Sequence, residues 1–242
     1  MRERLTVAAV AVAAVLALGG GGVYVYFFSG LRSSPTALGL SSPSPAASAT
    51  ASPSATSTGL AGQWKVTTGS LAGYRVKELF VGESAKHDAV ARTSTVSGGL
   101  TVSGDATSGY QVSAITITVS LGDLHSVDSV VGRNVTQRDG IVDRQLEVQQ
   151  FPTATFTSSS ASIAGPVTGQ QVNVSIPGRL TIHGVTRDVT VTARAQLNGE
   201  RIEIAGSVPA SMGDFGVAPP TAPFVTVDSA LTIEFDIFLT RA

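Results

Sequence analysis

The feature that most constrains the fold is a two-residue alternation of apolar and polar side chains, which recurs through residues 60–242. It is clearest near the end of the chain, where every second residue from Leu231 to Leu239 is apolar and most residues between them are polar. Val172, Val174 and Ile176 repeat the pattern. Since successive side chains of a strand point to opposite faces, the alternation predicts strands with one buried face.

Short turn motifs separate these predicted strands. Asn198-Gly199 favours a hairpin because both residues tolerate a positive φ, and His183-Gly184 lies in a second turn region. Within residues 110–120 the alternation changes phase next to Ala114, which indicates a β-bulge. Many strands joined by tight turns predict an all-β antiparallel sandwich or barrel.

One segment, residues 123–150, departs from the strand pattern. It is rich in charged residues and contains an internal glycine, Gly140, which weakens it as a long helix. It stops at Phe151-Pro152, where proline disfavours helix for the residue before it. We expect a short helix with an irregular connection that caps one end of the sheet.

The first 30 residues differ from the rest in composition. Residues 5–28 form an uncharged run of 24 residues, about 36 Å long as a helix against a hydrocarbon core of about 30 Å. Arg2 and Arg4 precede the run, and aromatic residues close it. This pattern predicts an uncleaved transmembrane anchor over residues 1–30, with the rest of the chain on the extracytoplasmic side of the cell membrane. A cleaved signal peptide and a secreted protein are the alternative.

Residues 31–59 are dominated by Ser, Thr, Pro and Ala. Such a segment has too few large side chains to offset the entropy cost of ordering, so we expect a disordered linker. Residues 60–242 then form one folded domain, which is long enough to bury a sizeable core.

Composition excludes several classes of function. The chain has 16 Lys and Arg against 17 Asp and Glu, so it offers no basic field for a nucleic acid. It has no cysteine, which excludes thiol catalysis and Cys-ligated metals. The three histidines lack metal-ligand spacing, and no nucleophile or phosphate-loop motif occurs. We therefore expect no catalysis, cofactor or metal. The oligomeric state stays open, with a dimer as one option.

Four motifs, taken in order along the chain, resemble one family. They are Arg138-Asp139, the stretch FPTATF at residues 151–156, the stretch LTIHGVTRDVTV at residues 180–191, and Asp214-Phe215-Gly216. Together they resemble the YceI-like family, from Trp64 to the C-terminus. Two positions depart from its pattern, because residues 140–142 replace a usual His-Leu and residues 73–78 replace a usual early strand motif.

The resemblance implies a lipocalin-like antiparallel β-barrel whose apolar interior holds a polyisoprenoid or a similar lipid, with no established catalytic residues. A barrel of about eight strands is wide enough for one slender ligand. The predicted wall of the channel consists of inward-facing apolar residues: Tyr74, Val76, Phe80, Ile115, Ile117, Phe156, Leu180, Ile182, Phe215, Ile233, Phe235 and Ile237.

Two polar residues are candidates for a head-group contact at the mouth of the barrel. Arg138 could serve there or hydrogen-bond a strand end or helix terminus, and His183 could serve there or simply form a turn. Two rival hypotheses stay open at this point. One is a structural or interaction domain of the cell envelope with a filled core, and the other is a lipid hydrolase or isomerase that uses Asp139, His183 or Asp214.

Overall fold

The computed structural model describes residues 32–41, 59–167, 171–198 and 200–242, and every structural statement below refers to these. Strands dominate them, which confirms the predicted all-β fold. The helical elements among them are α2 (Gln137–Gln145) and the 3-10 helix η1 (Met212–Phe215). None of the helices there has both the length and the apolar character needed to cross a bilayer. The anchor predicted over residues 1–30 lies outside the described residues.

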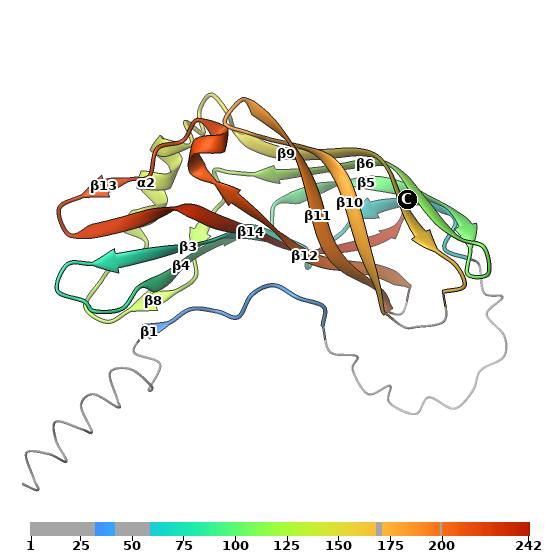
Figure 1. Cartoon of the computed structure of the whole chain (residues 1–242), viewed down its shortest axis with the longest axis horizontal. Helices are drawn as coiled ribbons and strands as arrows, with labels where there is room; N and C mark the ends of the chain where they lie inside the picture. Colours follow the sequence, from blue (N-terminus) through green and yellow to red (C-terminus); the bar gives the residue numbers. More distant parts are fainter. Residues whose placement is uncertain (1–31, 42–58, 168–170, 199) are drawn as a thin grey trace, which may run out of the picture.

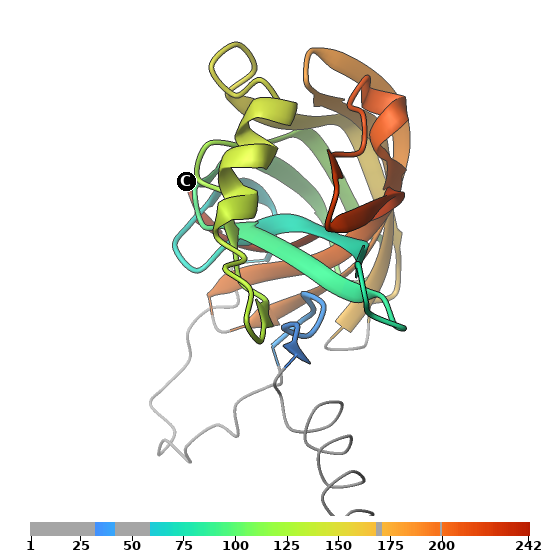
Figure 2. The same cartoon turned by 90° about the vertical axis from the view of Figure 1, so that its left-hand side faces the viewer.

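Eight strands close into an antiparallel barrel (Figures 1 and 2). Around the barrel they are β2 (Gly62–Val66), β5 (Val96–Asp105), β6 (Gly109–Ser120), β9 (Thr153–Ala164), β10 (Gln171–Ile182), β11 (Val185–Asn198), β12 (Arg201–Ser211) and β14 (Val225–Arg241). The ring closes because β14 pairs with β12 on one side and with β2 on the other. The ring strands follow one another in chain order, as in an up-and-down barrel, but the β3–β4 hairpin lies in the chain between β2 and β5 and pairs with β14 outside the ring.

The barrel flares at one end because β14 is long enough to pair with two successive strands along one edge. Its last residues, from Leu239 to Arg241, pair with β2, and its residues from Val225 to Asp236 pair with β3 (Leu71–Phe80). β3 continues into β4 (His87–Thr93), which in turn pairs with β7 (His125–Ser126). In Figure 2, α2 lies at the same end as this β3–β4 hairpin. The short hairpin of β13 (Thr221–Ala222) with β14 also lies there (Figure 1).

The turns and the bulge occur where the sequence predicts them. His183 and Gly184 have φ of 52° and 71° and join Ile182 to Val185 in a two-residue hairpin. Asn198 pairs with Arg201 across the second hairpin. Ala114 has a φ of 51°, and the register between β5 and β6 shifts by one residue beside it. The bulge explains the change of phase, because it keeps the apolar residues on both sides of Ala114 facing inward.

The charged segment that follows β6 confirms the expectation of a short helix within an irregular connection. Besides β7 it contains only β8 (Ser129–Val130) and the nine-residue α2. Asp139 in the first turn and Arg144 in the last turn of α2 match the helix dipole. The main core lies inside the barrel, and a smaller cluster around Leu121, Leu124 and Val148 lies near α2.

Residues 32–41 differ from the expected disordered linker, because they lie along the outer face of the barrel as an extended segment that we call the strap. Its first residues form β1 (Arg32–Ser33), which pairs with β8. Arg75 and Arg92 donate hydrogen bonds to its backbone carbonyls at residues 35 and 36. At its other end the Ser41 amide donates to Glu203 (2.6 Å). The barrel holds the strap largely through its backbone, so the strap's side chains gave no sign of the contact. Residues 42–58 lie outside the described part of the chain.

The outer face near the strap also carries Asp236, which predicts a pH dependence of stability. Burial raises the pKa of its carboxyl to about 7; the nearby Glu203 carboxylate adds to the rise and Arg201 opposes it. The unfolded chain has the ordinary, lower pKa, so the folded state binds an extra proton between these two values. The stability that this proton provides is complete at low pH and is lost as the pH rises from about 4 to about 7.

We expect Asp236→Asn to be more stable than the wild type at pH 8 by about 2 kcal/mol. This figure takes half of the rise in the pKa of Asp236, from 3.8 to about 7, and counts each pKa unit as about 1.4 kcal/mol. Urea unfolding between about pH 5 and pH 8 measures the effect, and the variant should lose most of the wild type's decline in stability. Asp188→Asn, at an exposed position of β11, is the matched control and should leave the profile unchanged. A D236N profile that runs parallel to the wild type would refute the prediction.

Candidate ligand-binding cavity

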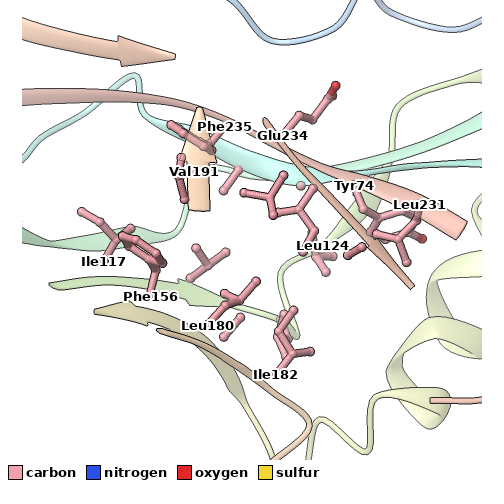
Figure 3. A pocket seen from close by; sticks show the side chains of 18 of the residues that line it. Tyr74, Ile117, Leu124, Phe156, Leu180, Ile182, Val191, Leu231, Glu234 and Phe235 are labelled. Carbon is pink, nitrogen blue, oxygen red and sulfur yellow. The ribbon is translucent and has the colours of Figure 1, made fainter. Parts of the chain in front are cut away.

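The barrel encloses an apolar cavity of about 1020 Å³. This volume lies at the upper end of the range for ligand pockets, roughly 300–1,000 Å³. Its wall is formed by inward-facing residues of the barrel strands, of β3 and of α2. Figure 3 shows part of this wall, with Ile117, Phe156, Leu180 and Ile182 on one side and Phe235 and Leu231 on the other.

The cavity extends along most of the length of β14. Lining residues on β14 run from Val225 at its start to Leu239 near its end. Fourteen residue steps at about 3.3 Å each bound its length at roughly 46 Å. A volume of 1020 Å³ spread along such a path suits one slender chain better than a compact ligand.

All twelve apolar residues that the sequence predicted as the channel wall line this cavity: Tyr74, Val76, Phe80, Ile115, Ile117, Phe156, Leu180, Ile182, Phe215, Ile233, Phe235 and Ile237. For the eight residues on ring strands the alternation selects the inward face, whereas Phe215 is in η1 and Tyr74, Val76 and Phe80 are on β3. That they contact a ligand stays a prediction.

Sequence reasoning missed other parts of the wall. Val174, Val189 and Val191 line the cavity, and their alternation was a sufficient signal. Ile141 and Val142 of α2 also line it, and they belong to the segment that departs from the family pattern. Their position carried no signal, because α2 reaches the cavity only through the tertiary fold.

The cavity opens near α2 and the β13–β14 hairpin. Arg133 and Asn134, in the connection before α2, line the cavity and are exposed to solvent. Phe224, in the β13–β14 turn, lines it and is half exposed. We call this opening the mouth.

His183 does not line the cavity. Its ring lies in the β10–β11 turn, where Nδ1 is 3.2 Å from the carbonyl oxygen of Phe215 and the ring meets Phe151 edge-on at 4.9 Å. Nε2 is 3.7 Å from a Glu147 carboxylate oxygen. These contacts support the interpretation of His183 as a turn residue. A head-group contact would require its ring to leave them.

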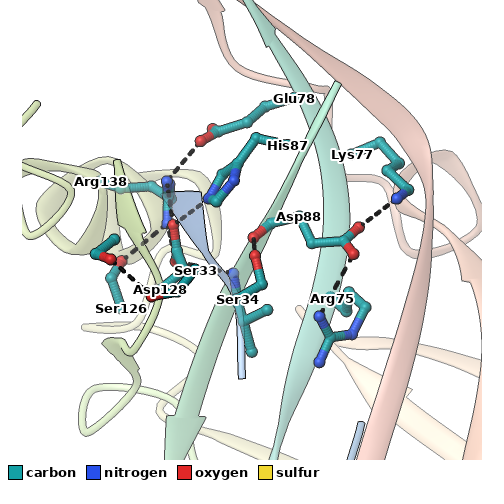
Figure 4. Close-up of polar contacts among 12 residues, drawn as sticks. Ser33, Ser34, Arg75, Lys77, Glu78, His87, Asp88, Ser126, Asp128 and Arg138 are labelled. Atoms are coloured by element: carbon teal, nitrogen blue, oxygen red, sulfur yellow. Dashed lines mark hydrogen bonds and ion pairs between the residues drawn. The ribbon is translucent and has the colours of Figure 1, made fainter. Parts of the chain in front are cut away.

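Arg138 lines the cavity, but its terminal nitrogens are bound to protein acceptors (Figure 4). Nη2 donates to Glu78 (2.6 Å), and Nη1 donates to Asp128 (2.7 Å) and to Ser126. Asp128 also lies 2.7 Å from Nε2 of His87 and accepts the Val90 amide. Arg138 therefore joins α2 to β3, β4 and the loop before β8. This geometry favours the structural role over the head-group contact.

Burial sets the electrostatics of this network. Burial alone would raise the pKa of the Asp128 carboxyl, but its hydrogen bonds with His87, Arg138 and the Val90 amide hold that pKa well below its usual range. Burial raises the pKa of Glu78, and Arg138 only partly offsets the rise. Burial also raises the pKa of the Tyr74 hydroxyl, which is deep in the wall beside the network. The site is thus a low-dielectric one in which charges persist only because they are paired.

Glu78, His87 and Asp128 also have the composition of a metal site, since one ligand atom of each lies within 4.8 Å of the others. The Arg138 guanidinium, however, binds both carboxylates. A cation already fills the role that a metal would have there, so the residues do not fit a metal centre.

The residues considered for catalysis do not meet in the cavity. Asp139, His183 and Asp214 are absent from its described wall. Asp139 instead accepts hydrogen bonds from the Ser126 amide and hydroxyl, and Asp214 bonds the Ser211 amide at the start of η1. The network of Glu78, His87, Asp128 and Arg138 was not foreseen as a unit, because its members come from β3, β4, the loop before β8 and α2.

A closed up-and-down barrel with a long apolar interior places the chain in the class of lipocalin-like β-barrels. Within that class, the model of the YceI-like domain matches residues 64–239, and the chain belongs to the YceI-like family.

Two relatives and one solved structure are similar to this chain. The chain is 32% identical over 95 residues to a UPF0312 protein of Pseudomonas putida strain F1, an alignment that covers 37% of this chain and 47% of the relative. It is 29% identical over 111 residues to a UPF0312 protein of Pseudomonas syringae pv. tomato, covering 42% and 54%. The matched region thus spans about half the length of these relatives. A polyisoprenoid binding domain from Saccharophagus degradans, implicated in plant cell wall breakdown, has the same fold at a TM-score of 0.51 and 15% identity, covering 75% of this chain and 99% of that domain.

Proposed function

We propose that this protein binds and carries a polyisoprenoid or a similar long-chain lipid inside the barrel, while tethered to the outer face of the cell membrane by residues 5–28. The observation that carries the proposal is the long apolar cavity of about 1020 Å³. Membership of the YceI-like family and the S. degradans domain, which has the same fold, support the choice of ligand class.

The physical basis is the transfer of an apolar chain out of water. Burial of apolar surface contributes about 25 cal/mol per Å², and no reactive group is needed to hold such a ligand. Most residues of the described wall are apolar, and many of its polar residues, among them Glu78, Arg133 and Arg138, lie near the mouth end. A ligand with a small polar head and a long apolar tail fits this distribution.

The cavity also separates this function from the rival hypotheses. A structural domain with a filled core would not leave a space of this size along the barrel axis. A hydrolase or isomerase would need a titratable pair free to act inside the cavity, whereas the two carboxylates of the described wall, Glu78 and Glu234, are ion-paired with Arg138 and Arg92. The geometry therefore favours binding.

The tether follows from the composition of the N-terminal segment. Residues 5–28 are 24 residues without charge, with two arginines before them, which favours an anchor that leaves the barrel on the extracytoplasmic side.

The test is to purify the full chain from its host membranes and to identify extracted lipid by mass spectrometry. We expect one lipid chain per barrel. After removal of the lipid, the protein should bind geranylgeraniol more tightly than stearyl alcohol, since the two alcohols share a head group and differ in methyl branching. Absence of any co-purified lipid, together with no binding of either alcohol, would overturn the proposal. Equal binding of both would reject the isoprenoid preference and keep a general lipid carrier.

A further inference from the structure

Three large apolar side chains are exposed together at the mouth end of the barrel. They are Val81 after β3, Val131 after β8 and Phe224 in the β13–β14 turn, with 69%, 56% and 50% of their surface exposed. The Val81 amide donates to the Phe224 carbonyl (3.0 Å), which joins two of these loops. The loop that carries Val131 also carries Arg133, whose guanidinium carbon lies 4.7 Å from the centre of the Phe80 ring, next to Val81. We call Val81, Val131 and Phe224 the apolar rim.

The apolar rim borders the opening of the cavity. Phe80 and Phe224 both line the cavity, and each is in or beside a rim loop. Arg133 lines it too, two residues after Val131. A ligand that enters or leaves by the mouth must therefore pass the rim.

The charges beside the rim are arranged to leave it apolar. Lys86, in the β3–β4 loop, forms an ion pair with Asp228 on β14 at 2.7 Å. The Arg133 guanidinium is stacked on an aromatic ring. Both features suit a surface that meets an apolar partner, because paired or stacked cations carry less of their field into the surroundings.

The strap brings the N-terminal part of the chain to the same end. β1 runs antiparallel to β8 with Arg32 opposite Val130, so the chain followed backwards from Ser33 to Arg32 heads towards Val131. Figure 4 shows Ser33 and Ser34 beside the Arg138 network. In the sequence, three residues separate Arg32 from Phe28, the last residue of the uncharged run. Four extended residue steps span at most about 14 Å.

We propose that the apolar rim docks into the surface of the lipid bilayer, so that the mouth of the cavity opens onto the acyl chains and a lipid can pass into the barrel without crossing water. This inference rests on the proposed function, because it takes residues 5–28 as the tether. The strap, bound along the barrel, gives the domain one orientation, whereas a free linker of 29 residues would leave it to tumble.

The experiment uses the fact that the chain has no cysteine. Single cysteines at Val131→Cys and Phe224→Cys in the full chain carry an environment-sensitive nitrobenzoxadiazole label. Thr107→Cys is the control, because Thr107 is exposed, lies in the β5–β6 turn at the opposite end of the barrel, and is not part of the described cavity wall. At this turn Asp105 pairs with Gly109, whereas the other ends of the two strands, Val96 and Val119, lie next to the Leu121 cluster near α2.

The labelled proteins are reconstituted in phosphatidylcholine vesicles with and without phosphatidylglycerol. We expect labels at 131 and 224 to shift to shorter emission wavelength and to be quenched by spin-labelled lipid, with little dependence on phosphatidylglycerol, while the label at 107 stays in water. Rim labels as water-exposed as the control would overturn the proposal. So would quenching at all three positions, which would mean that the domain has no fixed orientation. Efficient disulfide cross-linking of Val131→Cys between copies without lipid would assign the rim to a dimer contact instead.

The docking and the proposed function fail in different ways. If lipid co-purifies with the wild type but the rim labels stay in water, the docking is wrong and the lipid carrier stands. If the rim labels enter the bilayer but no lipid is found in the barrel, the docking stands and the carrier function is wrong.

Discussion

Replacing Arg138 by methionine (Arg138→Met) is expected to lower the free energy of unfolding by about 3–5 kcal/mol. Methionine keeps much of the length of the side chain but removes the charge and the donors. Asp128 and Glu78 are almost fully buried, at 5% and 3% exposure, and both would be left without the cation that pairs them. A buried carboxylate without a partner costs more than the pair gains when intact. Chemical denaturation of the wild type and the variant measures the difference.

Two further variants separate the loss of the pair from a simple loss of packing. Arg144→Met alters an exposed arginine of the same helix and should change stability by less than about 0.5 kcal/mol. The triple variant Glu78→Gln, Asp128→Asn, Arg138→Met removes all three charges and should recover much of the lost stability, because no uncompensated charge remains. If the triple variant is as unstable as Arg138→Met alone, the charge explanation is wrong and packing of the arginine stem accounts for the effect.

The network around Arg138 could not be predicted from the sequence, whereas the strand over residues 231–239 could. The alternation in residues 231–239 was enough to predict a strand, its inward face and the cavity residues on it, since a period of two leaves one choice of face. Glu78, His87 and Asp128 carried no comparable signal. They are brought together by the β3–β4 hairpin and by the return of the chain before α2, and a single sequence contains no record of such long-range proximity.

The strap shows a second limit, of a different kind. Residues 32–41 have the composition of a disordered segment, and the entropy argument that predicts disorder is sound for a chain without partners. It failed here because Arg75 and Arg92 bind the backbone carbonyls of the strap, which every residue type offers. Amino-acid composition describes only the side chains, so it cannot indicate that a segment is bound through its backbone.

Filling the cavity is expected to have the largest effect on function. Ala161, on β9, lines the cavity and is 4% exposed. In Ala161→Trp the indole must project into the lumen, because the neighbouring strands occupy the space on either side. In a narrow channel one such side chain interrupts the path of a chain-like ligand, so bound lipid per barrel should fall at least tenfold. Mass spectrometry of extracted lipid and titration with geranylgeraniol measure the loss.

The adjacent residue provides the control, because the strand period turns it outward. Ser162 is exposed and its hydroxyl bonds Gln111 on the neighbouring strand. Ser162→Trp adds the same side chain to the same strand, so it should leave lipid binding within twofold of the wild type. Ala195→Trp, on β11, which is separated from β9 by β10 alone, provides a second block should Ala161→Trp not fold. Wild-type lipid content in a folded inward variant would mean that the ligand does not occupy the barrel, and the wall residues would then be a core rather than a site.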